Sequence, residues 1–294
     1  DLTLMIDKKK LPFYFSIDFE DFYYDSMRAL EMYNPKSKEQ ALYNSYNSIK
    51  NICKSYLNNK KITFFVTGVL CRKMPELIKE IGSDGHEIAC HYNFHDDIKD
   101  SNREEFAENL DIAIDSIQKV AGYKPLGFRA PNFAINPDNY WAYEELSKRF
   151  EYDSSYKTSK NIESLEKEKN FIFDNNFLRE FFIYGMPILG NKISIRSGGT
   201  FLRLFSKKLL LKSMKECHDM GHIPLIYMHP YEMTANHEFW ISWNDLSKLD
   251  FKKRIYTWIR QTQWSHLGHK SVEGKIKYIC KYFEHQGPMK NLIE

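Results

Sequence analysis

The sequence lacks the features that would place it in a membrane or in an oxidising compartment. Its five cysteines are scattered, odd in number and form no CxxC pair, which points to a reducing compartment without a disulfide framework. No run of about 18 apolar residues is present, so no transmembrane helix is expected. No repeat, low-complexity tract or Pro/Gly-rich linker divides the chain. We therefore expect one domain over residues 1–294, with its core over residues 11–290.

The charge balance is also uninformative about large partners. A formal net charge of +3, with acids and lysines interspersed, does not indicate a nucleic-acid partner. No secretory signal peptide is recognisable, which favours a cytoplasmic protein. The composition is 43% hydrophobic and 28% charged, which is typical of a globular protein with an ample core.

Hydrophobic patterns alternate between strands and helices. Strands are expected at 11–18, 61–67, 87–90, 126–129 and 223–228, with shorter pieces at 171–173, 181–183 and 192–195. Helices are expected over 38–58, 74–81, 102–121, 139–150, 206–220, 251–261 and 272–286. At least five strand–helix alternations indicate an α/β fold built on a parallel sheet or barrel.

Side chains able to do chemistry recur where the predicted strands end, which is the functional edge of parallel α/β folds. Each one alone has an ordinary interpretation as a cap, a surface ion pair or a core histidine. Their recurrence at five strand ends favours a functional site. The residues are Asp18, Glu20, Asp21, His91, His95, Arg129, Asp153 and His229.

The stretch GHEIACHYNFH, residues 85–95, holds the most specific pattern. His91 and His95 are four residues apart and would face one metal ion if the backbone between them made a helical turn. His86 and Glu87 resemble the start of the zinc motif HExxH. The next histidine, however, follows His86 by five residues, so that motif does not form.

Two imidazoles and one carboxylate are the ligand set of a hydrolytic zinc site, which leaves a position for water. A second carboxylate would take the proton from that water, and His229 would protonate the leaving group. Arg129 would hold the base, and Asp153 would hold the imidazole of His229. These pairings rest on residue order and type.

Five segments, FSIDFED, HEIACHYNFH, FRAPNF, YDSSY and IYMHP, stand in the order of the five motifs of the NodB-homology polysaccharide deacetylases (carbohydrate esterase family 4). The sequence resembles most closely the branch with a DxED first motif found in surface- and exopolysaccharide gene clusters. SGGTFLRLF and WSHLGHKSVEGKIKYICKYF are similar to the C-terminal region of that branch. The resemblance covers roughly residues 11–290. It implies a distorted (β/α)7-type barrel and metal-dependent removal of N-acetyl or O-acetyl groups from a sugar.

The resemblance also implies roles for individual residues. Asp18 matches the catalytic base, and Arg129 the arginine that tunes it. His91 and His95 match metal ligands. His229 matches the general acid, with Asp153 behind it. The metal would be one divalent ion, Zn²⁺ by its ligand set, with Co²⁺ or Ni²⁺ as alternatives.

The first motif departs from the common pattern of two adjacent aspartates, the second of which binds the metal. Here Phe19 and Glu20 separate Asp18 from Asp21. Strand alternation puts Glu20 on the same face as Asp18, whereas Asp21 would serve if the chain turned sharply after the strand. Both remain candidates for the third ligand.

Phe133 and Tyr231 adjoin catalytic positions and would contact a sugar ring, although packing in the barrel is an equally good interpretation. The expected substrate is an acetylated amino sugar, alone or in an oligosaccharide, or linked to a lipid or nucleotide. Two other functions compete with this one. One is an amide hydrolase of another substrate on the same scaffold, and the other is a non-catalytic carbohydrate-binding protein.

Overall fold

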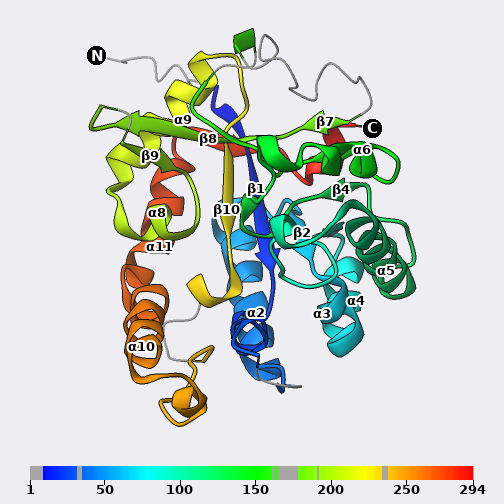
Figure 1. Cartoon of the computed structure of the whole chain (residues 1–294). Coiled ribbons are helices and arrows are strands. Elements are labelled where there is room, and N and C mark those ends of the chain that lie inside the picture. Colours follow the sequence, from blue (N-terminus) through cyan, green and yellow to red (C-terminus); the bar gives the residue numbers. More distant parts are fainter. Residues whose placement is uncertain are drawn as a thin grey trace, which may run out of the picture.

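The fold is built around strand β1 (Leu11–Phe19), which pairs with three other strands and whose residues from Phe13 onward are buried. The computed structural model describes residues 9–31, 35–160, 163–164, 178–190, 192–233 and 238–293. Seven parallel strands follow one another in the order β10-β1-β2-β3-β4-β5-β7. The sheet curls into a half-barrel, as expected from the sequence (Figure 1).

Most of the remaining strands of this sheet match the sequence patterns. The predicted strand at 87–90 is confirmed without change, and those at 61–67, 126–129 and 223–228 differ by a few residues at their ends. The short strands at 152–153 and 179–180 were not predicted. The bounds are β2 (Thr63–Val66), β3 (Glu87–Cys90), β4 (Gly127–Phe128), β5 (Tyr152–Asp153), β7 (Arg179–Glu180) and β10 (Leu225–Met228). A smaller sheet, in the order β6-β8-β9, contains β6 (Lys157–Thr158), β8 (Ile183–Ile188) and β9 (Ile193–Arg196). The strand expected at 171–173 lies outside the described residues.

Helices flank the large sheet, with α3, α4 and α5 to one side of β1 and α8, α10 and α11 to the other (Figure 1). The helix expected over 102–121 is α5 (Arg103–Ala121), which Asn102 and Glu105 cap at one end and Gly122, at a φ of 81°, ends at the other. No described helix is long and apolar enough to span a bilayer. The other helices are α1 (Phe22–Ala29), α2 (Glu39–Tyr56), α3 (Gly68–Lys73), α4 (Pro75–Ser83), α6 (Trp141–Ser147), α8 (Gly199–Leu204), α9 (Lys207–Asp219), α10 (Phe251–His266) and α11 (His269–Ile279).

The helix expected over 272–286 is wrong in its second half. Helix α11 ends at Ile279, and β11 (Phe283–His285) pairs in parallel with the start of β1. Phe283 and His285 are buried while Glu284 between them is partly exposed, which is the alternation of a strand with one covered face. The sequence here is too short for that alternation to be distinguished from the end of the preceding helix.

Gly127 marks the closest approach between β4 and β5. It lies opposite Tyr152 in the parallel register, and a Cβ atom at Gly127 would overlap the Tyr152 ring. The Tyr152 hydroxyl donates a hydrogen bond of 2.9 Å to Glu87, so the buried ring is held at both ends and has no room to move.

We predict that Gly127→Ala lowers the free energy of unfolding by about 1–3 kcal/mol, because a methyl group must be forced into a filled space. The matched control is Gly274→Ala within α11, where an added Cβ meets nothing within 4 Å. That change should instead raise the free energy of unfolding by about 0.5–1 kcal/mol. Urea unfolding of both variants tests this pair, and equal stabilities would contradict it.

Candidate active site

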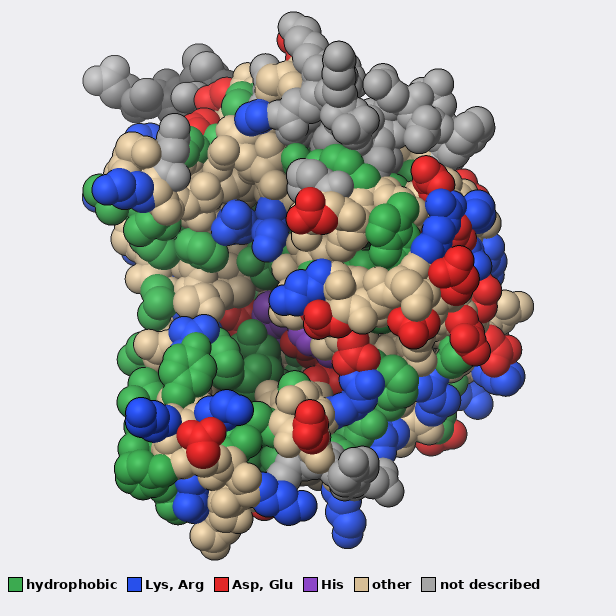
Figure 2. All heavy atoms as spheres, in the orientation of Figure 1, with side chains coloured by type: hydrophobic (Ala, Val, Ile, Leu, Met, Phe, Trp, Pro, Cys, Tyr) green, Lys and Arg blue, Asp and Glu red, His purple; other side chains and the backbone are tan. Residues whose placement is uncertain are grey.

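The candidate residues meet at one edge of the large sheet because its strands are parallel. His91, Arg129 and His229 are each the first residue after a strand, namely β3, β4 and β10. Asp18 is the penultimate residue of β1, and Asp153 ends β5. The register places Cys90 beside Phe128, and Ile17 beside Met228. Residues more than 200 positions apart in the chain therefore converge on the hollow in the middle of the face in Figure 2, where histidine side chains are visible.

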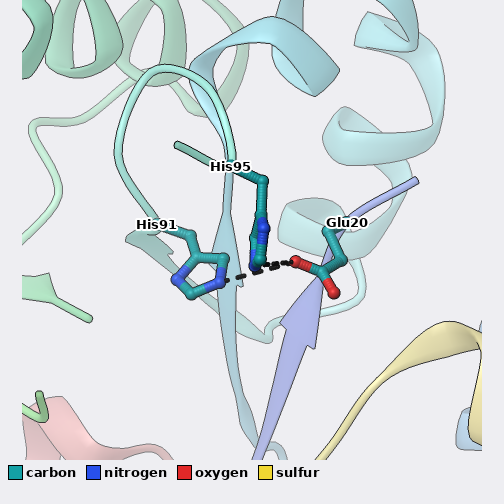
Figure 3. Close-up of side chains that lie close together, drawn as sticks. All are labelled: Glu20, His91 and His95. Atoms are coloured by element: carbon teal, nitrogen blue, oxygen red, sulfur yellow. Dashed lines mark ion pairs between the residues drawn. The ribbon is translucent and has the colours of Figure 1, made fainter. Parts of the chain in front are cut away.

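Glu20, His91 and His95 form a cluster whose ligand atoms all lie within 4.8 Å of one another. Glu20 Oε2 is 2.6 Å from His95 Nε2 and 3.7 Å from His91 Nε2, and Figure 3 shows the two imidazoles turned toward the carboxylate. His91 Nδ1 is 2.8 Å from the carbonyl oxygen of Arg129, to which it can donate. This hydrogen bond leaves the lone pair of Nε2 facing Glu20, and Nε2 has no hydrogen-bond partner. A buried imidazole held in this way, beside a carboxylate and a second imidazole, fits a divalent metal.

The two histidines do not come together through a helical turn, as their spacing suggested. Residues 91–97 form no helix, with bends at 93–95, and Tyr92 adopts a φ of 68°. The left-handed conformation at Tyr92 turns the chain back toward the sheet immediately after β3. His95 therefore returns beside His91 from a loop, as Figure 3 shows.

The structure decides between the two candidates for the carboxylate ligand. Asp21 is the N-cap of α1, where Oδ1 accepts a hydrogen bond from Tyr24 N and Oδ2 one from Lys38 N. Both oxygens are thus engaged by backbone amides, and Asp21 is not part of the histidine cluster. Glu20 is the carboxylate that the cluster contains.

Asp18 lies beside this cluster and is held by Arg129. The fully buried Arg129 guanidinium donates hydrogen bonds to Asp18 Oδ1 at 2.5 Å and to Ser16 Oγ at 2.9 Å. Two further hydrogen bonds go to the Ser154 carbonyl and hydroxyl oxygens. The guanidinium carbon also lies 4.0 Å from the centre of the Phe65 ring. The expected pairing of Arg129 with Asp18 is therefore present, and it fixes the orientation of the carboxylate.

His229 lies on the other side of Asp18, with Nε2 at 3.8 Å from Asp18 Oδ2. The partner of its other nitrogen is Glu232, whose Oε2 is 2.9 Å from Nδ1, and not Asp153 as expected. Glu232 Oε1 in turn accepts a hydrogen bond of 2.9 Å from Arg203, and the side chains of both residues are fully buried. Burial by itself lowers the pKa of His229, but the hydrogen bond and charge of Glu232 outweigh it, so that the pKa lies above its usual value.

The expectation that Asp153 holds His229 is therefore wrong. Asp153 accepts hydrogen bonds from the amide and hydroxyl of Ser155, and it pairs with Glu180, its neighbour across the β5–β7 register. Burial and the Asp153 charge raise the pKa of Glu180 well above its usual range. Asp153 therefore belongs to a buried carboxyl pair with Glu180. A residue's order in a motif could not reveal which carboxylate reaches the histidine.

The two aromatic candidates flank the same residues. The Tyr231 ring stacks on His229 at 5.0 Å between centres and 15° between planes. Phe133 lies 4.9 Å from Tyr227 and 5.5 Å from the Arg129 guanidinium carbon. Each is partly exposed, so both a packing role and a substrate contact remain compatible with their positions.

Sequence reasoning did not single out Glu232 and Arg203. Glu232 stands three residues after His229, within reach of its backbone and side chain, and this spacing was the available signal. Arg203 lies in the segment SGGTFLRLF, in which the resemblance assigns no role to any residue. Its guanidinium also donates to the carbonyl oxygens of Gln263 and Leu267, and so joins that segment to the C-terminal region.

We predict that the wild-type chain binds about one Zn²⁺ and that His91→Ala/His95→Ala binds none. The matched control is His218→Ala/His222→Ala, which removes another pair of histidines four residues apart and should leave binding unchanged. Metal content by mass spectrometry after dialysis measures this. Equal loss in both double variants would contradict the assignment.

Metal binding should also release a proton near neutral pH. Burial by itself lowers the pKa of His95, but the Glu20 carboxylate outweighs it and raises the pKa to about 9 in the metal-free protein. The imidazole is then protonated at pH 7 and must lose that proton to bind metal. Titration calorimetry in buffers of different ionisation enthalpy should show about one proton released per Zn²⁺ near pH 7, and none above pH 10. Absence of proton release at neutral pH would exclude this coupling.

Comparison with known proteins gives the site its family context. A family model described as polysaccharide deacetylase matches residues 44–150, which include His91, His95 and Arg129. Peptidoglycan deacetylase-like protein FGM2 of Gibberella zeae is 33% identical over 96 residues, which cover 33% of this chain and 28% of that protein. Peptidoglycan-N-acetylglucosamine deacetylase of Bacillus cereus is 30% identical over 89 residues, which cover 30% of this chain and 32% of that protein.

The matched stretch thus spans about a third of the length of these curated relatives. Among solved structures, a family 4 carbohydrate esterase from Streptomyces lividans in complex with acetate aligns with a TM-score of 0.43 and 13% identity, over 76% of this chain and 80% of that one. Over residues 44–150 the chain is thus similar to the polysaccharide deacetylases.

Proposed function

We propose that this chain is a metal-dependent hydrolase that removes an N-acetyl group from an acetylated amino sugar. The observation that carries the proposal is the convergence of three groups at one edge of the sheet. They are the buried cluster of Glu20, His91 and His95, the Asp18–Arg129 pair and the His229–Glu232 pair. A ligand set, a base and an acid are the parts that hydrolysis of an amide requires.

Glu20, His91 and His95 would hold the metal, and their donor set suits Zn²⁺, with Co²⁺ and Ni²⁺ as alternatives. When bound, such an ion lowers the pKa of a water molecule and polarises a carbonyl oxygen. The hydrogen bond from His91 to the Arg129 carbonyl fixes the ring orientation and presents Nε2 to the site.

Asp18 acts as the general base in this proposal. One of its oxygens is held by Arg129, which leaves Oδ2 directed toward the side of His229. The carboxylate is almost fully buried, and the guanidinium compensates the charge that it keeps there. Asp18 takes a proton from the attacking water.

His229 acts as the general acid and gives a proton to the departing nitrogen. Glu232 holds Nδ1 and favours the protonated imidazole, so that Nε2 carries the transferable proton on the side facing Asp18. Water and the N-acetyl group are thereby converted to acetate and a free amine. Arg203 keeps the Glu232 carboxylate in place on the side away from the histidine.

The names of the curated relatives, among them a peptidoglycan-N-acetylglucosamine deacetylase, support an N-acetylated hexosamine as the substrate class. The DxED first motif and the C-terminal segment further support a precursor of a surface polysaccharide. The competing function is sugar binding without catalysis. The variants below distinguish the two functions, because a binding protein would release no acetate in any variant.

We predict that Asp18→Asn lowers the rate of acetate release from an N-acetylated chito-oligosaccharide by at least about 10²-fold, because the base is lost while the metal ligands stay. The Zn²⁺ content of the variant should match that of the wild type. Asp219→Asn, at an exposed surface carboxylate, should leave the rate unchanged and serves as the control. Full activity of Asp18→Asn would remove Asp18 from the mechanism.

The role of His229 as the general acid is tested by the pH dependence of the rate. A general acid works only while protonated, so kcat/KM falls as pH rises through the pKa of His229. Glu232→Gln removes the charge that raises this pKa, and the alkaline limb of the pH profile should move to lower pH. Asp153→Asn, which lacks contact with the imidazole, should leave the limb in place. A shift in Asp153→Asn and none in Glu232→Gln would restore the pairing that the sequence suggested.

A further inference from the structure

Helix α10 combines exposed apolar side chains with a one-sided charge. Four of the twelve large hydrophobic side chains that are exposed in the described part of the chain lie on this one helix, at exposed fractions of 69% for Phe251, 38% for Ile255, 65% for Tyr256 and 55% for Ile259. The same 16 residues contain four lysines and arginines and no aspartate or glutamate. The whole chain, by contrast, has a net charge of only +3.

The exposed side chains share one face of the helix. Phe251, Ile255 and Ile259 follow one another at intervals of four residues, which aligns them along one side of an α-helix. The opposite side packs on the protein, where the buried Gln261 side chain exchanges hydrogen bonds of 2.9 Å with both backbone groups of Ile241. Trp258 contacts the Trp240 and Trp243 rings. The apolar residues on the outer face therefore are not needed to attach the helix.

Basic side chains border this outer face. Lys252 and Lys253 are exposed beside Phe251, and Arg260 follows Ile259. Arg254 is turned inward, with its guanidinium carbon 3.9 Å from the centre of the Trp243 ring. Asp250, the N-cap residue, lies 3.8 Å from Lys253 Nζ and is the acid nearest in sequence. Figure 2 shows green and blue side chains intermixed over α10 on the left of the molecule, beside the hollow that contains the histidines.

We propose that the outer face of α10, defined as Phe251, Lys252, Ile255, Tyr256 and Ile259 with the flanking Lys253 and Arg260, docks on an anionic lipid bilayer. Apolar and aromatic side chains along a helix with a basic border are the features by which a helix lies in the interface of a membrane. The lysines and arginine attract lipid phosphates, and the apolar residues enter the boundary with the acyl chains.

The charge favours a membrane over a second copy of this chain. A symmetric dimer through this face would place the basic borders of both copies against each other, with no acidic residue on the helix to neutralise them. An anionic surface supplies the opposite charge. The same basic border would hold the helix on the bilayer before its apolar residues insert.

Docking through α10 would hold the candidate site close to the bilayer surface. The inner face of α10 packs near the loop that carries His229, where Trp264 contacts Phe22 at 5.2 Å and Phe22 contacts Tyr231 at 4.7 Å between ring centres. The Gln263 carbonyl accepts from Arg203, which holds Glu232. The inference goes beyond the deacetylase proposal and does not require it, because membrane binding is measured without substrate.

The test is cosedimentation of the full chain with vesicles of phosphatidylcholine alone or mixed with phosphatidylglycerol. Wild type should sediment with the mixed vesicles and not with phosphatidylcholine alone. Phe251→Ser/Ile255→Ser/Ile259→Ser should abolish sedimentation, and Lys252→Glu/Lys253→Glu should weaken it about tenfold or more. Thermal unfolding and Zn²⁺ content show that these variants fold.

Two matched controls distinguish binding through this face from nonspecific adsorption to vesicles. Ile112→Ser/Leu189→Ser/Ile193→Ser removes three exposed apolar residues elsewhere, and Lys208→Glu/Lys212→Glu reverses two exposed lysines of α9. Both should bind vesicles like wild type. Equal loss in a control, or no binding of wild type to mixed vesicles, would overturn the proposal.

Sedimentation velocity without lipid tests whether a second copy of the chain occupies this face instead. If the wild type is a monomer, the outer face of α10 is free to bind lipid. If the wild type is a dimer and the α10 triple variant is a monomer, the face would instead belong to an interface between two copies. Release of acetate from a soluble oligosaccharide should be the same in the α10 variants and in wild type. A failure of the deacetylase proposal would therefore appear as absent activity in every protein, with vesicle binding unaffected.

Discussion

The burial of one guanidinium sets the arrangement of the whole candidate site. Arg129 has no exposed surface, and a charge in that position is tolerated only when it is paired and fully hydrogen bonded. Its side chain fixes Asp18 from β1 and Ser154 from the segment after β5, while its backbone carbonyl fixes His91 after β3. Arg129 thus ties the Asp18 carboxylate and the His91 imidazole to each other across the sheet.

A second buried arginine performs the corresponding task on the other side. Arg203 holds Glu232, which holds His229, and it also donates to the carbonyl oxygens of Gln263 and Leu267 at the end of α10. Gly268, with a φ of 82°, permits the close approach there, because a Cβ atom at that position would overlap the Arg203 carbonyl. Arg129 orients the proposed general base, Asp18, and Arg203 supports the proposed general acid, His229, through Glu232. Each carboxylate is held by an arginine from a distant segment, which makes the site rigid before any ligand binds.

Much of this architecture was readable from the sequence because it depends on local patterns. The apolar run from Leu11 and the strand Glu87–Cys90 are short, mostly buried and bounded by polar residues. The helix from Arg103 has its cap, its stripe and its terminal glycine within one continuous stretch. The strand at Phe283 was missed because only its pairing with β1 distinguishes it from the end of the helix before it.

The sequence by itself determined which residue types stand at the ends of the parallel strands, and hence that Asp18, His91, His95, Arg129 and His229 would meet. Strand order and residue chemistry suffice for that, since parallel strands bring their carboxyl ends to one edge. The tertiary structure alone decided the partners. Glu20 rather than Asp21 joins the histidines because backbone amides occupy Asp21, and Glu232 rather than Asp153 reaches His229 because Ser155 and Glu180 engage Asp153. Such choices depend on distances of a few ångströms between side chains from separate segments, and no spacing along the chain encodes those distances.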